Sequence, residues 1–285
     1  MDFDFSNAAL VLIGHGSTLN ADSALPAHQH ADALRARQMF GQVLEAYWKE
    51  EPYIWQVLRG VFAPTVFIVP LFISEGYFTE EVIPRELGLC SSGEKSFKSI
   101  QKRGEQTLIY CKPVGTHESM TEVLMARARE IVQKFPFPHA PKTKDTSLFI
   151  AGHGTGNNEN SRVAIERQVE LIAAQGIYAD VHAVFMEEEP KIEAVYTLAT
   201  QKNVVVVPFF ISDGLHSYED IPLMLGEPAS VVQERFKLGQ PTWRNPTEKK
   251  GKRVWYTPSI GTEALMVDVI LARVSESVPL LGVQV

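Results

Sequence analysis

Residues 10–16 read Leu-Val-Leu-Ile-Gly-His-Gly, and residues 148–154 read Leu-Phe-Ile-Ala-Gly-His-Gly. In each stretch a short apolar run ends in a Gly-His-Gly triplet. A continuous apolar run of this length, closed by glycine, is typical of a strand buried inside a parallel sheet. The two stretches lie 138 residues apart, so the chain carries the same strand-and-turn signal twice.

The likeness between the two stretches extends far along the chain. Placing residues 10–88 over residues 148–226 gives 25 identical positions out of 79 without a gap. Chance agreement at ordinary residue frequencies would give about five. Beyond this region the offset grows to 146, which pairs Gly115 with Gly261 and leaves an extra loop in the second copy. The chain is therefore an internal duplication, and we expect two domains over residues 1–142 and 143–285.

Each copy alternates strand and helix patterns. In the second copy the apolar runs predict strands at 147–151, 181–185, 203–211 and 255–257. Ser161 can cap the first helix, Ser217 can open another with Asp220 as its capping-box partner, and a last helix begins near Thr262. This alternation predicts an α/β fold in which each copy forms a parallel sheet covered by helices on both faces.

Composition excludes several classes of protein. The 285 residues are 45% hydrophobic and 21% charged, which is typical of a globular protein. A net charge of −7 argues against nucleic acid as the main partner. The longest apolar run, at about 204–211, is too short to span a membrane, and the acidic start of the chain does not resemble a secretory signal. We therefore expect a cytoplasmic protein whose two cysteines, Cys90 and Cys111, are free thiols.

Three reactive side chains follow three predicted strands of the second copy. His153 lies between two glycines after the first strand, Glu187 follows the second, and His216 follows the third. Because the carboxyl ends of parallel strands meet at one edge of a sheet, these side chains should converge there. We predict that His153, Glu187 and His216 bind a metal and act in catalysis. Gly154 and Gly214, which allow close approach to the backbone, are predicted to contact the substrate.

The first copy has lost most of this set. It keeps His15, but Lys49 stands where the second copy has Glu187, and Phe78 stands where it has His216. A charged lysine cannot bind a metal, and phenylalanine neither binds a metal nor moves protons. We therefore expect the first copy to be the structural half, with His15 as a further substrate-binding residue.

Two polar stretches, 91–106 and 237–253, lack periodicity and are predicted to be loops. Ordinary solvated loops can be basic too. Recurrence at the same point of both copies of an acidic chain nevertheless points to an anionic ligand. The basic residues are Lys95, Lys98, Lys102 and Arg103 in the first stretch, and Lys237, Arg244, Lys249, Lys250, Lys252 and Arg253 in the second.

Segments 11–17, 185–190, 208–222 and 258–262 resemble the sirohydrochlorin chelatases of the CbiX and SirB type, the class II chelatases of cobalamin and sirohaem biosynthesis. The resemblance covers nearly all of both halves apart from the two basic stretches. It implies two flavodoxin-like lobes, an anionic tetrapyrrole substrate, and metal insertion without ATP or a permanently bound cofactor. The family's paired histidines map onto His153 and His216. Some relatives keep both histidines in the first half, where this chain has Phe78.

The chemistry of the three side chains fits metal insertion. A macrocycle must lose two pyrrolic protons as it receives a partly dehydrated divalent ion. Neutral imidazoles bind Co²⁺, Fe²⁺, Ni²⁺ or Zn²⁺, and imidazole titrates at about pH 6.5. The sequence has no GxxxxGK[ST] loop and no HExxH helix, which argues against an ATP-driven enzyme and a zinc hydrolase. A non-catalytic carrier of metal or tetrapyrrole is the alternative that the same residues fit.

Overall fold

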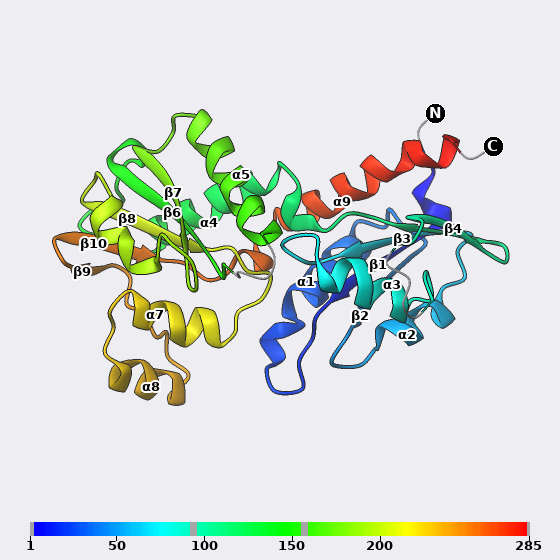
Figure 1. Ribbon diagram of the computed structural model, residues 1–285, viewed down its shortest axis with the longest axis horizontal. Helices are drawn as coiled ribbons and strands as arrows, with labels where there is room; N and C mark the ends of the chain where they lie inside the picture. The colour runs from blue at the N-terminus through cyan, green and yellow to red at the C-terminus, as the bar shows by residue number, and fades with distance from the viewer. Residues whose placement is uncertain (1–2, 92–95, 155–158, 284–285) are drawn as a thin grey trace. The chain divides into compact units, whose positions relative to one another are not determined.

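The computed structural model describes residues 3–91, 96–154 and 159–283, and the chain forms two compact units (Figure 1). The first unit comprises Met1–His117 and Ala264–Val285, and the second comprises Glu118–Glu263. Both units are built of a sheet with helices, which confirms the predicted α/β class. Among the helices of the described residues, none is both long and apolar enough to cross a membrane.

The first unit contains a five-stranded sheet in the order β2-β1-β3-β5-β4. The strands are parallel except for β4, which is antiparallel to β5 at the edge of the sheet. All seven residues of the central strand β1 are buried, as its unbroken apolar run predicts. The strands are β1 Ala8–Gly14, β2 Gln42–Tyr47, β3 Thr65–Pro70, β4 Ile100–Arg103 and β5 Gln106–Tyr110; the helices are α1 Leu25–Ala36, α2 Ile54–Val57, α3 Ile83–Glu86 and α9 Met266–Ser277.

The second unit repeats this architecture. Its five strands have the order β7-β6-β8-β10-β9, and β9 is again the antiparallel edge strand. The central strand β6 is buried along its whole length. The strands are β6 Thr146–Gly152, β7 Asp180–Phe185, β8 Asn203–Pro208, β9 Thr247–Lys249 and β10 Lys252–Tyr256; the helices are α4 Met120–Lys134, α5 Asn160–Ala174, α6 Val195–Leu198, α7 Ile221–Met224 and α8 Ala229–Lys237.

The last helix of each sequence copy packs on the sheet of the other copy. Helix α4 follows β5 in the chain but packs against β8 and β10, whereas α9 follows β10 but packs against β3. Figure 1 shows α9, in red, beside strands of the first unit. Along the chain, the two compact units therefore meet after His117 and after Glu263. Repeated residues identify equivalent helices, but they do not reveal which sheet each helix covers.

All four predicted strands of the second copy are present, but the polar stretches contain more structure than expected. Strands β6, β7, β8 and β10 lie where strands were predicted, although β8 ends at Pro208. Strand β4 lies inside the first stretch predicted as a loop, and β9 lies inside the second. Both are short edge strands of mainly polar residues, so they lack the apolar alternation that identifies a half-buried strand.

Two predicted helix caps are wrong. Helix α5 begins at Asn160, so Ser161 lies inside the helix rather than at its cap. Ser217 lies inside a π-helical turn, His216–Asp220, rather than in front of a helix. Its side chain bonds backward to Gly214 instead of capping the helix that follows.

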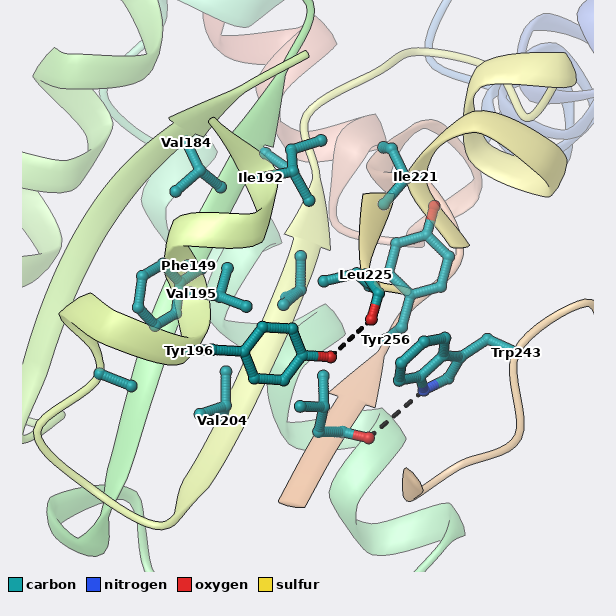
Figure 2. Packing of buried hydrophobic residues seen from close by; sticks show 14 of the residues in the cluster. Phe149, Val184, Ile192, Val195, Tyr196, Val204, Ile221, Leu225, Trp243 and Tyr256 are labelled. Atoms are coloured by element: carbon teal, nitrogen blue, oxygen red, sulfur yellow. Dashed lines mark hydrogen bonds between the residues drawn. The ribbon is translucent and has the colours of Figure 1, made fainter. Parts of the chain in front are cut away.

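Figure 2 shows the core on one face of the second sheet, where strand residues such as Phe149 and Val204 pack against Val195 and Tyr196 of α6. Two buried aromatic side chains also satisfy their polar groups. The Tyr196 hydroxyl donates to the Leu225 carbonyl at 2.7 Å, and Trp243 Nε1 donates to a β10 carbonyl at 3.3 Å. These rings therefore bury apolar area without leaving a donor unpaired.

Candidate functional site

The Gly-His-Gly turn after β6 places His153 beside Glu187. Gly154 has a φ of +66°, and a Cβ there would lie 2.9 Å from Cβ of Phe185, so the turn requires glycine. The backbone N–H of Glu187 donates to the His153 carbonyl at 3.0 Å. Their side chains also approach, because His153 Nε2 lies 3.8 Å from Glu187 Oε1. One backbone contact thus brings together residues from the ends of two neighbouring strands.

His216 is held by a turn with its own internal bonds. It begins the π-helical turn that leads into α7. Ser217 Oγ accepts a bond from the Gly214 N–H at 2.9 Å, and the Tyr256 hydroxyl donates to the Ser217 carbonyl at 2.8 Å. Burial raises the pKa of the Tyr256 phenol well above its ordinary value, so this hydroxyl keeps its proton. A buried donor from β10 therefore fixes the backbone that carries His216.

The two imidazoles meet at the carboxyl edge of the sheet. The ring centroids of His153 and His216 lie 5.0 Å apart, and the ring planes are inclined at 75°. The side chains are 31% exposed for His153, 51% for His216 and 58% for Glu187, so a ligand can reach all three. His153 therefore lies next to both Glu187 and His216.

The three side chains are not arranged as a complete metal-binding site. Within residues 3–91, 96–154 and 159–283, no group of three or more His, Cys, Asp or Glu side chains is placed to hold a metal ion. The assignment of His153, Glu187 and His216 as metal ligands stays a prediction. An ion that is a substrate must be released again, so a site for it does not need the closed ligand set of a structural metal.

Asp220 lies at the same edge, and the prediction that it caps a helix is wrong. The expected capping box with Ser217 does not form. Instead, Asp220 Oδ2 lies 2.7 Å from Nδ1 of His216, at the other end of the π-helical turn. The spacing His-x-x-x-Asp puts two side chains on one face of a helical turn, and this signal could have revealed the pair.

The same edge of the first unit is aromatic. The rings of His15 and Phe78 have centroids 5.1 Å apart at 72°, and Trp48 lies within 5.4 Å of His15 and 5.0 Å of Phe78. The Lys49 ammonium lies 4.9 Å from the centroid of the Trp48 ring. In the first unit, the partners of the histidine ring are thus the aromatic rings of Phe78 and Trp48. The role of His15 in substrate binding stays a prediction.

Most basic residues of the second polar stretch lie away from the site. Arg253 is paired in register with Asn203, the first residue of β8, whereas His153 follows the last residue of β6. The Lys252 ammonium donates to carbonyls of the segment before β8, and Arg253 pairs with Glu248. Lys252 and Arg253 therefore lie at the opposite end of the strands from His153, and binding of an anionic ligand by the basic stretches stays a prediction.

Arg103 also lies away from the site of its unit, whereas Arg244 lies closer to the site end of the second sheet. In the first unit, Arg103 stands opposite Gln106 at the start of β5, which is again the edge away from His15. Arg244 is exposed and precedes Asn245, whose side chain bonds to both backbone groups of Tyr256 at the site end of β10. Lys95 lies outside the described residues.

The fold and this edge together define a class: a tandem chelatase-like α/β protein with two imidazoles and a carboxylate at the carboxyl edge of one sheet. Residues 9–131 and 147–277 each match the CbiX family. The chain therefore belongs to the CbiX family, in a form that contains the family's unit twice.

Two proteins of similar sequence support the assignment to this family. A probable sirohydrochlorin cobaltochelatase of Halobacterium salinarum is 41% identical over 279 residues, covering 94% of this chain and 91% of that protein. A sirohydrochlorin cobaltochelatase of Methanococcus maripaludis is 28% identical in an alignment of 141 residues, and the match covers 42% of this chain and 96% of that protein.

Solved structures show the same fold. A multi-domain protein of Deinococcus radiodurans, described as structurally similar to chelatases, has a TM-score of 0.75 and 30% identity. The match covers 94% of this chain but only 54% of that protein. SirB of Bacillus subtilis with Fe³⁺ has a TM-score of 0.66 at 17% identity, covering 97% of this chain and 98% of that one.

Proposed function

We propose that this chain inserts a divalent metal ion, Co²⁺ or Fe²⁺, into sirohydrochlorin or a closely related tetrapyrrole, without ATP or a resident cofactor. The proposal rests on the adjacency of His153, Glu187 and His216 at one open edge of the second unit. The full-length likeness to a protein named as a probable sirohydrochlorin cobaltochelatase supports this substrate and favours Co²⁺.

The roles follow from the proton balance of the reaction. A divalent ion enters and two pyrrolic protons leave, so the metallated macrocycle carries the same net charge as the free, protonated one. His153 and His216 present the ion and accept protons, because a neutral imidazole can do either near neutral pH. Glu187, which is more than half exposed, accepts the second proton or orients His153. Gly154 and Gly214 leave the backbone accessible to the macrocycle, and His15 is a further contact with it.

The decisive assay follows the absorbance of sirohydrochlorin after addition of Co²⁺, or of Fe²⁺ under anaerobic conditions, with a protein-free control for spontaneous insertion. An enzyme converts many equivalents of tetrapyrrole per chain. A carrier gives a spectral change that stops at one equivalent, and this result would exclude catalysis.

The first copy supplies a substitution that the fold accepts. Phe78 holds a ring at nearly the same distance and inclination from His15 as His216 holds from His153. His216→Phe should therefore keep the melting temperature while lowering insertion by at least about 100-fold, the scale of losing a proton-transfer group. His139→Phe, at an exposed histidine between α4 and β6, is the matched control. If His216→Phe keeps near-normal turnover, His216 is not catalytic.

A further inference from the structure

The carboxylate of Asp220 lies within hydrogen-bonding distance of His216. Oδ2 of Asp220 lies 2.7 Å from Nδ1 of His216, and both side chains are partly exposed, at 41% and 51%. Around the same imidazole lie the His153 ring at 5.0 Å and the Phe210 ring at 6.2 Å between centroids. An aromatic ring and a second imidazole thus flank His216, while Asp220 bonds to its Nδ1 side.

Comparison of the two copies shows that the fold does not need this carboxylate. Val82 occupies the position of Asp220 in the first copy, just as Phe78 occupies that of His216. Val82 is fully buried, and it lies in a π-helical turn like that of the second copy. The backbone of the turn is anchored alike in both copies, because the Tyr110 hydroxyl donates to the Thr79 carbonyl at 2.8 Å. The acid is therefore present where the imidazole is present and absent where it is absent.

The bond has a definite chemical consequence. A carboxylate accepts only, so Nδ1 must carry the hydrogen when it is bonded to Asp220. The other nitrogen, Nε2, of a neutral His216 then holds its lone pair and can bind a metal ion or take a proton. A carboxylate partner also fixes the plane of the imidazole ring.

We propose that Asp220 is the positioning residue of the site, which holds His216 in the Nδ1–H tautomer with Nε2 free to act on metal and substrate. Its contribution to metal insertion rests on the function proposed above. Its effect on the tautomer of His216 does not.

The test compares Asp220→Val, which introduces the residue of the first copy, with Asp220→Asn, whose amide oxygen can still accept the Nδ1–H bond. In histidine-¹⁵N-labelled protein at about pH 8, where imidazole is neutral, long-range ¹H–¹⁵N spectra report which ring nitrogen is protonated. His216 should be Nδ1–H in the wild type and in Asp220→Asn, and should move towards Nε2–H in Asp220→Val. Glu219→Gln, which removes one charge from the same turn, is the matched control.

The insertion rates give the second readout. Asp220→Val should lose about 10- to 100-fold in insertion, the usual cost of removing the partner of a metal-binding histidine, and Asp220→Asn should recover most of it. An unchanged tautomer in Asp220→Val overturns the proposal, and so does a wild-type insertion rate in that variant. If the wild type inserts no metal but the tautomer shifts as described, the proposed function fails while the positioning of His216 stands.

Discussion

Nη2 of Arg273 lies 2.8 Å from Oγ1 of Thr116, although 157 residues separate the two in the chain. Arg273 belongs to α9, is only 4% exposed, and also donates to the Pro113 carbonyl at 2.9 Å. The second unit repeats the arrangement, with Nη2 of Arg127 in α4 lying 2.9 Å from Oγ1 of Thr262. Each exchanged helix is thus attached by a buried guanidinium to the segment that follows the fifth strand in sequence of the unit it joins.

Replacing Arg273 by alanine should lower the free energy of unfolding by about 2–4 kcal/mol, because it removes the charge-assisted bonds of a buried guanidinium to the Pro113 carbonyl and the Thr116 hydroxyl. Arg273→Lys should lose less, since a single ammonium can keep only part of the forked set of bonds. Urea unfolding of the purified variants measures both losses.

The exposed pair between Arg37, at the end of α1, and Asp268 of α9 provides the control, with side chains 42% and 59% exposed. Arg37→Ala should cost no more than about 1 kcal/mol, because exposed ion pairs contribute little. Equal losses for Arg37→Ala and Arg273→Ala would show that the buried bonds do not anchor α9.

Two glycines of the second unit should respond differently to alanine. A Cβ at Gly261 would lie 1.5 Å from the carbonyl oxygen of Ile211, in the segment that leads to His216. Gly251 has a φ of +76° but nothing within 4 Å of its Cβ. We expect Gly251→Ala to cost about 1–2 kcal/mol through its backbone conformation alone, and Gly261→Ala to lower the melting temperature much further or prevent folding. Thermal melts and soluble yield distinguish the two, and similar melts would contradict the steric argument.

The two thiols should differ in reactivity. Burial raises the pKa of the Cys111 thiol to about 11, whereas Cys90 is only partly buried. At about pH 8 a disulfide reagent should label Cys90 in the folded protein and Cys111 only after denaturation, because the thiolate is the reactive form. Rapid labelling of Cys111 in the native chain would contradict this.

The same thiol makes stability depend on pH. A free thiol ionises at about 8.5, below the folded pKa of about 11, so the unfolded chain loses the proton first. Ionisation of Cys111 should therefore leave the free energy of unfolding unchanged below about pH 8. It should lower that free energy as the pH rises towards 11. In Cys111→Ala, the fall in stability over this range should be smaller than in the wild type.

Much of the fold and of the site's composition could be predicted from the residues. The duplication is visible as identical positions, and buried parallel strands such as β6 are unbroken apolar runs. Parallel strands also share an edge at their carboxyl ends, so His153 and His216 could be expected to lie near one another before any coordinates were known.

Other features depend on contacts that a local pattern does not contain. Helices α4 and α9 have apolar faces that would suit either sheet, so their exchange is decided by the tertiary structure. The basic residues Lys252 and Arg253 were assigned by charge alone, and the register of β10 places them at the far edge. Asp220 satisfied a capping pattern, but the π-helical turn put His216, not a backbone N–H, within its reach.

The helix exchange also reverses the order in which the two halves can be finished during synthesis. The second unit is one continuous segment, Glu118–Glu263, whereas the first needs its own opening residues together with Ala264–Val285. The ribosome therefore completes the whole second unit before it makes α9, the helix that packs on the sheet of the first unit. Until α9 has been made, the part of the first sheet that it covers beside α1 stays exposed, which makes the newly made N-terminal half the part most in need of a chaperone.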